Sequence, residues 1–160
     1  MKRDPHLLDL SRDHHHALVL ARRAETTAAD GTDDDVTSTW ETIAEAFDAD
    51  LAPHFEVEEL YLLPPIDAAG EVELVRRTRS DHERLRSLLA SADDPRSRLR
   101  EFGERLRQHV RFEEQELFPT AEATLDAAQL RAVANASAAT ATATPVERAA
   151  VRDAKRSCPK

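Results

Sequence analysis

The chain is poor in cysteine, glycine and aromatic residues, and it has no long apolar run. Its 160 residues include one cysteine, three glycines and 4% aromatic residues. The single Cys158 cannot form a disulfide within the chain or a thiolate metal site, which excludes zinc fingers and iron–sulfur clusters. Scarce aromatic residues disfavour strands, whereas the frequent alanine, leucine, glutamate and arginine favour helices. We therefore expect an all-α fold.

The charge balance restricts the classes of partner. Acidic residues number 31 and basic residues 22, which gives a formal net charge of −9. A protein of this sign is repelled by phosphate, so neither nucleic acid nor an anionic membrane is an expected partner. The N-terminal residues contain no apolar signal region, and nowhere does a run of about eighteen apolar residues occur. With a single cysteine, these features favour a cytoplasmic protein.

Prolines, glycines and acidic pairs divide the chain into helical stretches. Pro64 and Pro119 are expected to end the second and fourth of these, and Ser11 and Ser38 to cap the first and second. The four helices are predicted at residues 11–29, 38–63, 71–92 and 96–118, with a shorter fifth helix at 126–135. The short connections predict an up-down-up-down four-helix bundle over residues 1–135. Residues 136–160 are predicted to be an Ala/Thr-rich linker and a charged C-terminal tail.

One motif occurs twice. Residues 54–64 read HFEVEELYLLP and residues 109–119 read HVRFEEQELFP, so both follow H-x-x-x-E-E-x-x-x-x-P. Positions four apart in a helix lie on one face. His54 with Glu58, and His109 with Glu113, can therefore each present one imidazole and one carboxylate inward. Pro53, inside the second helix, is expected to kink it beside His54.

The first and third helices each contribute an Asp-His pair, Asp13-His14 and Asp81-His82. His82 lies on an apolar face. His14 is the first of three consecutive histidines, and it has alanine seven residues later, where His15 and His16 have arginine. We therefore place His14 inward and keep His15 as the alternative.

Four imidazoles and two carboxylates in one helical core are costly to bury without compensation. A metal centre supplies that compensation. Imidazole and carboxylate donors suit iron or manganese, and two half-sites suit two ions. The candidate metal residues are His14, His54, Glu58, His82, His109 and Glu113.

The two Asp-His pairs, together with HFEVEELYLLP and HVRFEEQELFP, resemble the hemerythrin-like family of HHE cation-binding domains over about residues 10–135. The resemblance implies two non-haem iron ions between four helices, bridged by an oxo or hydroxo oxygen and two carboxylates. The same six residues match the implied ligands. Members of the family carry oxygen, sense oxygen or iron, repair damaged iron centres or decompose peroxide. The implied partners are oxygen, peroxide or nitric oxide.

The chain departs from the oxygen carriers of this family in two ways. The matching carboxylate of its fourth helix is Glu113, where the carriers have aspartate. They have a fifth histidine four residues after that of the third helix, where this chain has Arg86. Fewer protein ligands leave open metal positions, which favours reaction with oxygen or peroxide, including catalase-like turnover. Glu116 and Tyr61, each seven residues after a motif histidine, could fill such positions. The alternative function is a sensor or binding module without turnover, in which metal or oxygen occupancy controls a partner contact.

One further residue could orient a metal-binding histidine through a hydrogen bond. Asp50 lies four residues before His54, one helical turn away, and could accept a hydrogen bond from its ring.

Overall fold

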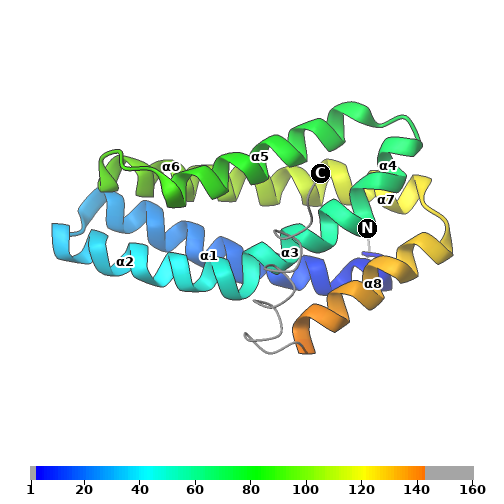
Figure 1. Cartoon of the computed structure of the whole chain (residues 1–160), viewed down its shortest axis with the longest axis horizontal. Helices are drawn as coiled ribbons and strands as arrows, with labels where there is room; N and C mark the ends of the chain where they lie inside the picture. Colours follow the sequence, from blue (N-terminus) through cyan, green and yellow to red (C-terminus); the bar gives the residue numbers. More distant parts are fainter. Residues whose placement is uncertain (1–2, 143–160) are drawn as a thin grey trace, which may run out of the picture.

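The computed structural model describes residues 3–142, which are helical apart from short connections and contain no strand. The long helices α1, α2, α5 and α6 lie lengthwise beside one another, and α8 crosses near the N-terminus of α1 (Figure 1). The expected all-α fold is confirmed. The α-helices are α1 (Leu8–Asp30), α2 (Asp33–Ala46), α3 (Ala52–Val57), α4 (Leu63–Ala68), α5 (Val72–Ala90), α6 (Pro95–Phe112), α7 (Phe118–Thr124) and α8 (Ala127–Thr142). None of the helices within this range has the length and apolar composition needed to cross a membrane.

Shorter helical segments join several of these helices without a break. A 3₁₀ turn, η1 (Pro5–Leu7), precedes α1. Three π-helical segments connect α2 to α3, α3 to α4, and α6 to α7; they are η2 (Phe47–Leu51), η3 (Glu58–Leu62) and η4 (Glu113–Leu117). Residues 33–68 and 95–124 are therefore each one continuous helical stretch.

A proline lies two residues after the end of each π segment. The last hydrogen bond of each segment reaches five residues back, as from the Leu63 N–H to the Glu58 carbonyl, and the next donor is missing because that residue is proline. The wider π turn accommodates the missing N–H and the bulk of the proline ring. The prediction that the helices end at Pro64 and Pro119 was therefore wrong. They continue to Ala68 and Thr124.

The helix caps also differ from the expected ones. Thr32 caps α2 and forms a reciprocal capping box with Asp35, so the acidic run begins a helix. Ser11 and Ser38 both lie inside helices. The fifth helix, α8, continues to Thr142 and includes the buried Ser137, so it takes in part of the stretch predicted as linker. The division of the chain at residue 135 remains a prediction, and Cys158 lies outside the described residues.

The apolar core consists of two clusters that alternate with polar residues along the helices. On α1, Leu10 belongs to one cluster and Ala17 to the other, and His14 lies between them. On α5, Val75 and Leu85 belong to different clusters in the same way, with His82 between them. A buried polar layer therefore separates two apolar layers.

The helices α1 and α6 approach each other closely through small residues. A Cβ added at Gly103 of α6 would lie 2.7 Å from the carbonyl oxygen of Ala21 on α1. Only a residue without a side chain permits this separation. The contact fixes the spacing of the two helices that carry His14 and His109.

Candidate metal centre

The buried polar layer contains the four histidines and two glutamates that the sequence analysis selected. The histidines come from four different helices: His14 from α1, His54 from α3, His82 from α5 and His109 from α6. The glutamates are the first residues of two π segments, Glu58 of η3 and Glu113 of η4. None of the six is more than 4% exposed.

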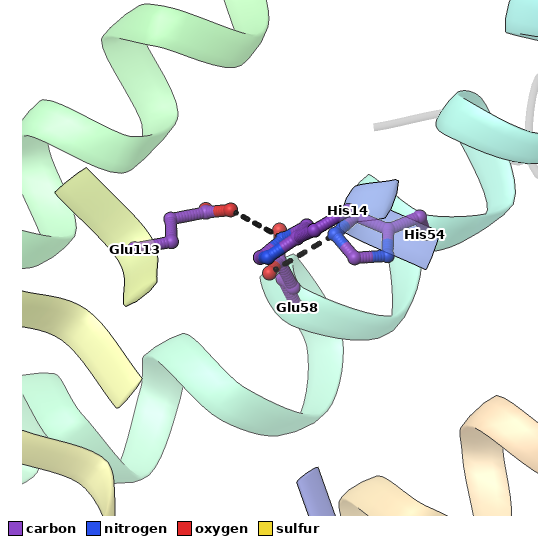
Figure 2. Close-up of side chains that lie close together, drawn as sticks. All are labelled: His14, His54, Glu58 and Glu113. Carbon is purple, nitrogen blue, oxygen red and sulfur yellow. Dashed lines mark ion pairs between the residues drawn. The ribbon is translucent and has the colours of Figure 1, made fainter. Parts of the chain in front are cut away.

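These side chains form two groups of four that share both glutamates. One group consists of His14, His54, Glu58 and Glu113, and Figure 2 shows it. In the other group His82 and His109 replace the first two histidines. Within each group, one donor atom from every residue lies within 4.8 Å of the others.

Each shared carboxylate offers one oxygen to each group. Glu58 Oε1 lies 3.3 Å from His54 Nε2, and Glu58 Oε2 lies 3.2 Å from His82 Nε2. Glu113 Oε2 lies 3.1 Å from His14 Nε2, and its Oε1 lies 3.2 Å from His109 Nε2. This is the arrangement that two carboxylates bridging a pair of cations require.

A carboxylate lies behind three of the imidazole rings within hydrogen-bonding distance. Glu114 Oε1 is 2.7 Å from Nδ1 of His14, and Glu59 Oε1 is 2.7 Å from Nδ1 of His82. Asp13 Oδ2 is 3.2 Å from Nδ1 of His54. A carboxylate at Nδ1 assigns the proton to that nitrogen and directs the lone pair of Nε2 into the cluster.

The fourth ring has a longer contact, with Asp81 Oδ2 3.6 Å from Nδ1 of His109. Asp50, which the sequence suggested for the role of a hydrogen-bond acceptor, is exposed on η2. The residues that lie behind the rings are instead the second glutamate of each E-E pair and the aspartate of each Asp-His pair. Both pairs are repeated in the sequence, and that repetition was the signal available for finding them.

The buried donor atoms lack the partners that a cation between them would supply. Nε2 of His14, His54 and His82 and all four carboxylate oxygens lack hydrogen-bond partners. With the proton on Nδ1, lone pairs of nitrogen and oxygen face each other, which is repulsive. Two ligand atoms about 2.1 Å from an ion and at right angles are about 3.0 Å apart, close to the observed separations. The six residues therefore fit a metal centre.

The pKa directions show how strongly the buried groups interact with each other when no metal is bound. Burial alone would lower the pKa of His54, but the charge of Glu58 and the hydrogen bond to Asp13 outweigh it and raise that pKa well above its usual range. Burial would raise the pKa of Glu58, yet His54 and His82 lower it well below its usual range. Burial likewise opposes ionisation of Glu59, but hydrogen bonds from His82 and Arg86 lower its pKa to about 2.

The other residues considered from the sequence lie outside the two groups. Tyr61 is 46% exposed, and Glu116 pairs with Arg77 at 3.5 Å on the surface. His15 is exposed, whereas His14 is buried, so the structure brings His14 and not its neighbour to the cluster. Arg86 donates a hydrogen bond of 2.8 Å to Glu59 and does not reach the buried donors.

A groove of about 630 Å³ leads to one side of the cluster. Residues of α1, η2, α3 and α8 line it, and Asp13 and His54 belong to its wall. A second cavity of about 10 Å³ is lined by His14, His54 and His109, and it shares Asp13, Ala17, Leu51 and His54 with the groove. The inner cavity has room for about one water molecule.

The fold and this site define a helical domain built to bind metal cations. The sequence model described as the hemerythrin HHE cation binding domain matches residues 6–121, which is more than half of the chain. The chain belongs to this family. None of the curated proteins and none of the solved structures compared with the chain matches it.

Proposed function

We propose that the chain is an up-down-up-down four-helix bundle that holds two non-haem iron ions. His14 and His54 would bind one ion, and His82 and His109 the other. Glu58 and Glu113 would bridge both. The observation that carries this proposal is that each shared carboxylate directs one oxygen to each group of four. Imidazole and carboxylate donors without thiolate suit iron.

We infer further that the centre reacts with peroxide or oxygen. The six residues offer four donor atoms to each ion, and an octahedral ion takes six. Tyr61 is exposed and Glu116 pairs with Arg77 on the surface, so neither belongs to the buried set. When bound, the two irons supply electrons and exchangeable positions for a small oxidant.

The chain itself supplies orientation, exclusion of water and access. Glu59 and Glu114 hold the rings of His82 and His14 with Nε2 inward. The apolar clusters on both sides keep bulk water from the polar layer. The groove and its inner cavity, which together reach His14, His54 and His109, suit a molecule of the size of oxygen or peroxide.

Two measurements test this proposal. Protein from iron-replete cells is expected to contain close to two irons per chain by elemental analysis, and one zinc without iron would contradict it. The reduced protein is then mixed with peroxide, and separately with oxygen, in a stopped-flow spectrometer. Rapid oxidation by peroxide with no long-lived oxygen adduct supports the reactive function. A stable oxygen complex that releases oxygen under vacuum would instead indicate a carrier.

A sensor without turnover is the second candidate, and one contact favours it. The helix α8 packs on η3, the π segment that begins at Glu58. Movement of Glu58 on metal or oxygen binding would reach α8 directly. A sensor of this kind is expected to show slow peroxide turnover and a change in protease sensitivity of α8 on iron loading.

A further inference from the structure

In each of the two groups of four, one imidazole contacts a carboxylate that also binds an arginine, and the same imidazole stacks on a phenylalanine. These rings are His14 and His82, whose Nδ1 atoms contact Glu114 and Glu59. In both cases an arginine binds the same carboxylate from the outer side, and a phenylalanine stacks on the imidazole.

In the first group the arginine comes from the N-terminal segment. Arg3 Nη2 donates to Glu114 Oε2 at 2.6 Å, and Ser11 Oγ donates to Glu114 Oε1 at 2.7 Å. The guanidinium of Arg3 lies 5.1 Å from the ring centroid of Phe118. The ring of Phe118 in turn stacks on His14 with centroids 5.1 Å apart and an interplanar angle of 12°.

In the second group the arginine comes from α5, one turn after the histidine. Arg86 Nη1 donates to Glu59 Oε1 at 2.8 Å. Its guanidinium lies 5.6 Å from the ring centroid of Phe55, which stacks on His82 at 3.8 Å and 13°. Arg86 therefore stands at the position where the oxygen carriers have their fifth histidine, and it binds the carboxylate that contacts Nδ1 of His82.

The sequence repeat does not produce this likeness. Both glutamates are the second of their E-E pair, but Phe55 follows a motif histidine whereas Phe118 precedes a motif proline. The two arginines come from unrelated segments. The same arrangement of histidine, glutamate, arginine and phenylalanine therefore occurs twice, although its members come from different places in the chain.

We propose that Arg86 and Arg3 are positioning residues that tune the two iron sites through Glu59 and Glu114. This inference rests on the proposed function. A carboxylate that accepts a hydrogen bond from the Nδ1–H of an imidazole increases the electron donation of that ring to its metal. An arginine on the same carboxylate withdraws part of its charge and fixes its orientation. The arginine therefore weakens the donation and favours the reduced state of the iron.

An ordinary surface ion pair would not have this effect. Exposed pairs contribute little, and Arg84 with Glu101 on the neighbouring surface is such a pair, at 2.7 Å with side chains 46% and 31% exposed. Glu101 touches no imidazole within the described residues. The distinguishing feature of Arg86 is that its acceptor is also the partner of a buried ring.

The test measures the midpoint potential of the iron-loaded protein by spectroelectrochemical titration. Arg86→Gln is expected to lower the midpoint potential. Removing a neighbouring positive charge stabilises the oxidised iron, which carries more positive charge than the reduced iron. Glu59→Gln is expected to raise it, because the ring loses an anionic partner. Arg84→Gln is the matched control and is expected to leave it unchanged. Arg86→Lys is expected to restore most of the wild-type value.

A double variant separates tuning through Glu59 from a direct charge effect. In the Glu59→Gln background, Arg86→Gln is expected to shift the potential by less than half of its effect in the wild type. An equal shift in both backgrounds, or no shift in the single variant, would overturn the proposal. Glu59→Gln is also expected to lose iron to a chelator about 10-fold faster. Absence of iron from the wild-type protein would refute the proposed function instead.

Discussion

The close approach of α1 and α6 gives a stability prediction that also reports on the metal centre. In Gly103→Ala the new Cβ would lie 2.7 Å from the carbonyl oxygen of Ala21 and 2.8 Å from Cγ of Glu25. The side chain of Glu25 can move away, but the carbonyl oxygen belongs to a helix and cannot. The two helices must therefore separate locally.

Two opposing effects decide the sign of the change in stability. Alanine is favoured over glycine inside a helix by about 1 kcal/mol. Overpacking a tight contact costs about 1–3 kcal/mol. Because the crowded atom is a backbone oxygen, we expect the upper part of that range and a net destabilisation of about 1–2 kcal/mol. Separation of the helices also moves His14 away from Glu113, so the variant is expected to hold less iron.

Urea unfolding followed by far-UV circular dichroism measures the first effect, and elemental analysis measures the second. Gly70→Ala is the control, because Gly70 has a φ of +97° with nothing within 4 Å of an added Cβ. It is expected to cost about 1 kcal/mol through backbone strain and to leave the iron content unchanged. A Gly103→Ala protein that is more stable than the wild type would show that helix propensity outweighs the contact and would refute the reasoning.

Further predictions concern the metal residues and the C-terminal segment. His14→Ala is expected to lower the iron content measured by elemental analysis, and His15→Ala to leave it unchanged; the reverse would place the wrong histidine inward. Glu58→Ala is expected to lose both ions, and retention of one would argue against a shared carboxylate. Because Glu58 and Asp13 raise the pKa of His54 well above its usual range, protons compete strongly for Nε2, and acidification is expected to release iron. Deletion of residues 146–160 is expected to preserve iron content and helicity, since no candidate metal residue lies there.

The helical periodicity of the chain was sufficient to predict the contents of the buried layer. His54 and Glu58 are four residues apart, so any helix places them on one face. The alanine seven residues after His14 distinguished it from its neighbours, and the structure brings these residues together. These features depend only on local spacing, and for that reason they could be found without the fold.

The features that were missed depend on contacts between helices. The partner of His82 is Glu59, on a different stretch of the chain, whereas Asp50 was chosen because it is close to His54 in sequence. The prolines were expected to end helices, because a proline removes a hydrogen bond. The π segments before Pro64 and Pro119 absorb that loss, and no local pattern predicted them.

The carboxylates around the four imidazoles also set the net charge that the proposed centre would have in each oxidation state. Six of them contact the rings: Asp13, Glu58, Glu59, Asp81, Glu113 and Glu114. Two of the six are paired with Arg3 and Arg86. Arg3 also pairs with Glu122, so with neutral imidazoles the nine charged side chains sum to −5. The two divalent ions of the proposed centre would leave a net charge of −1, and two trivalent ions would leave +1. Oxidation of the proposed centre would therefore reverse the sign of this net charge, which would couple it to the uptake of an anion or the release of a proton.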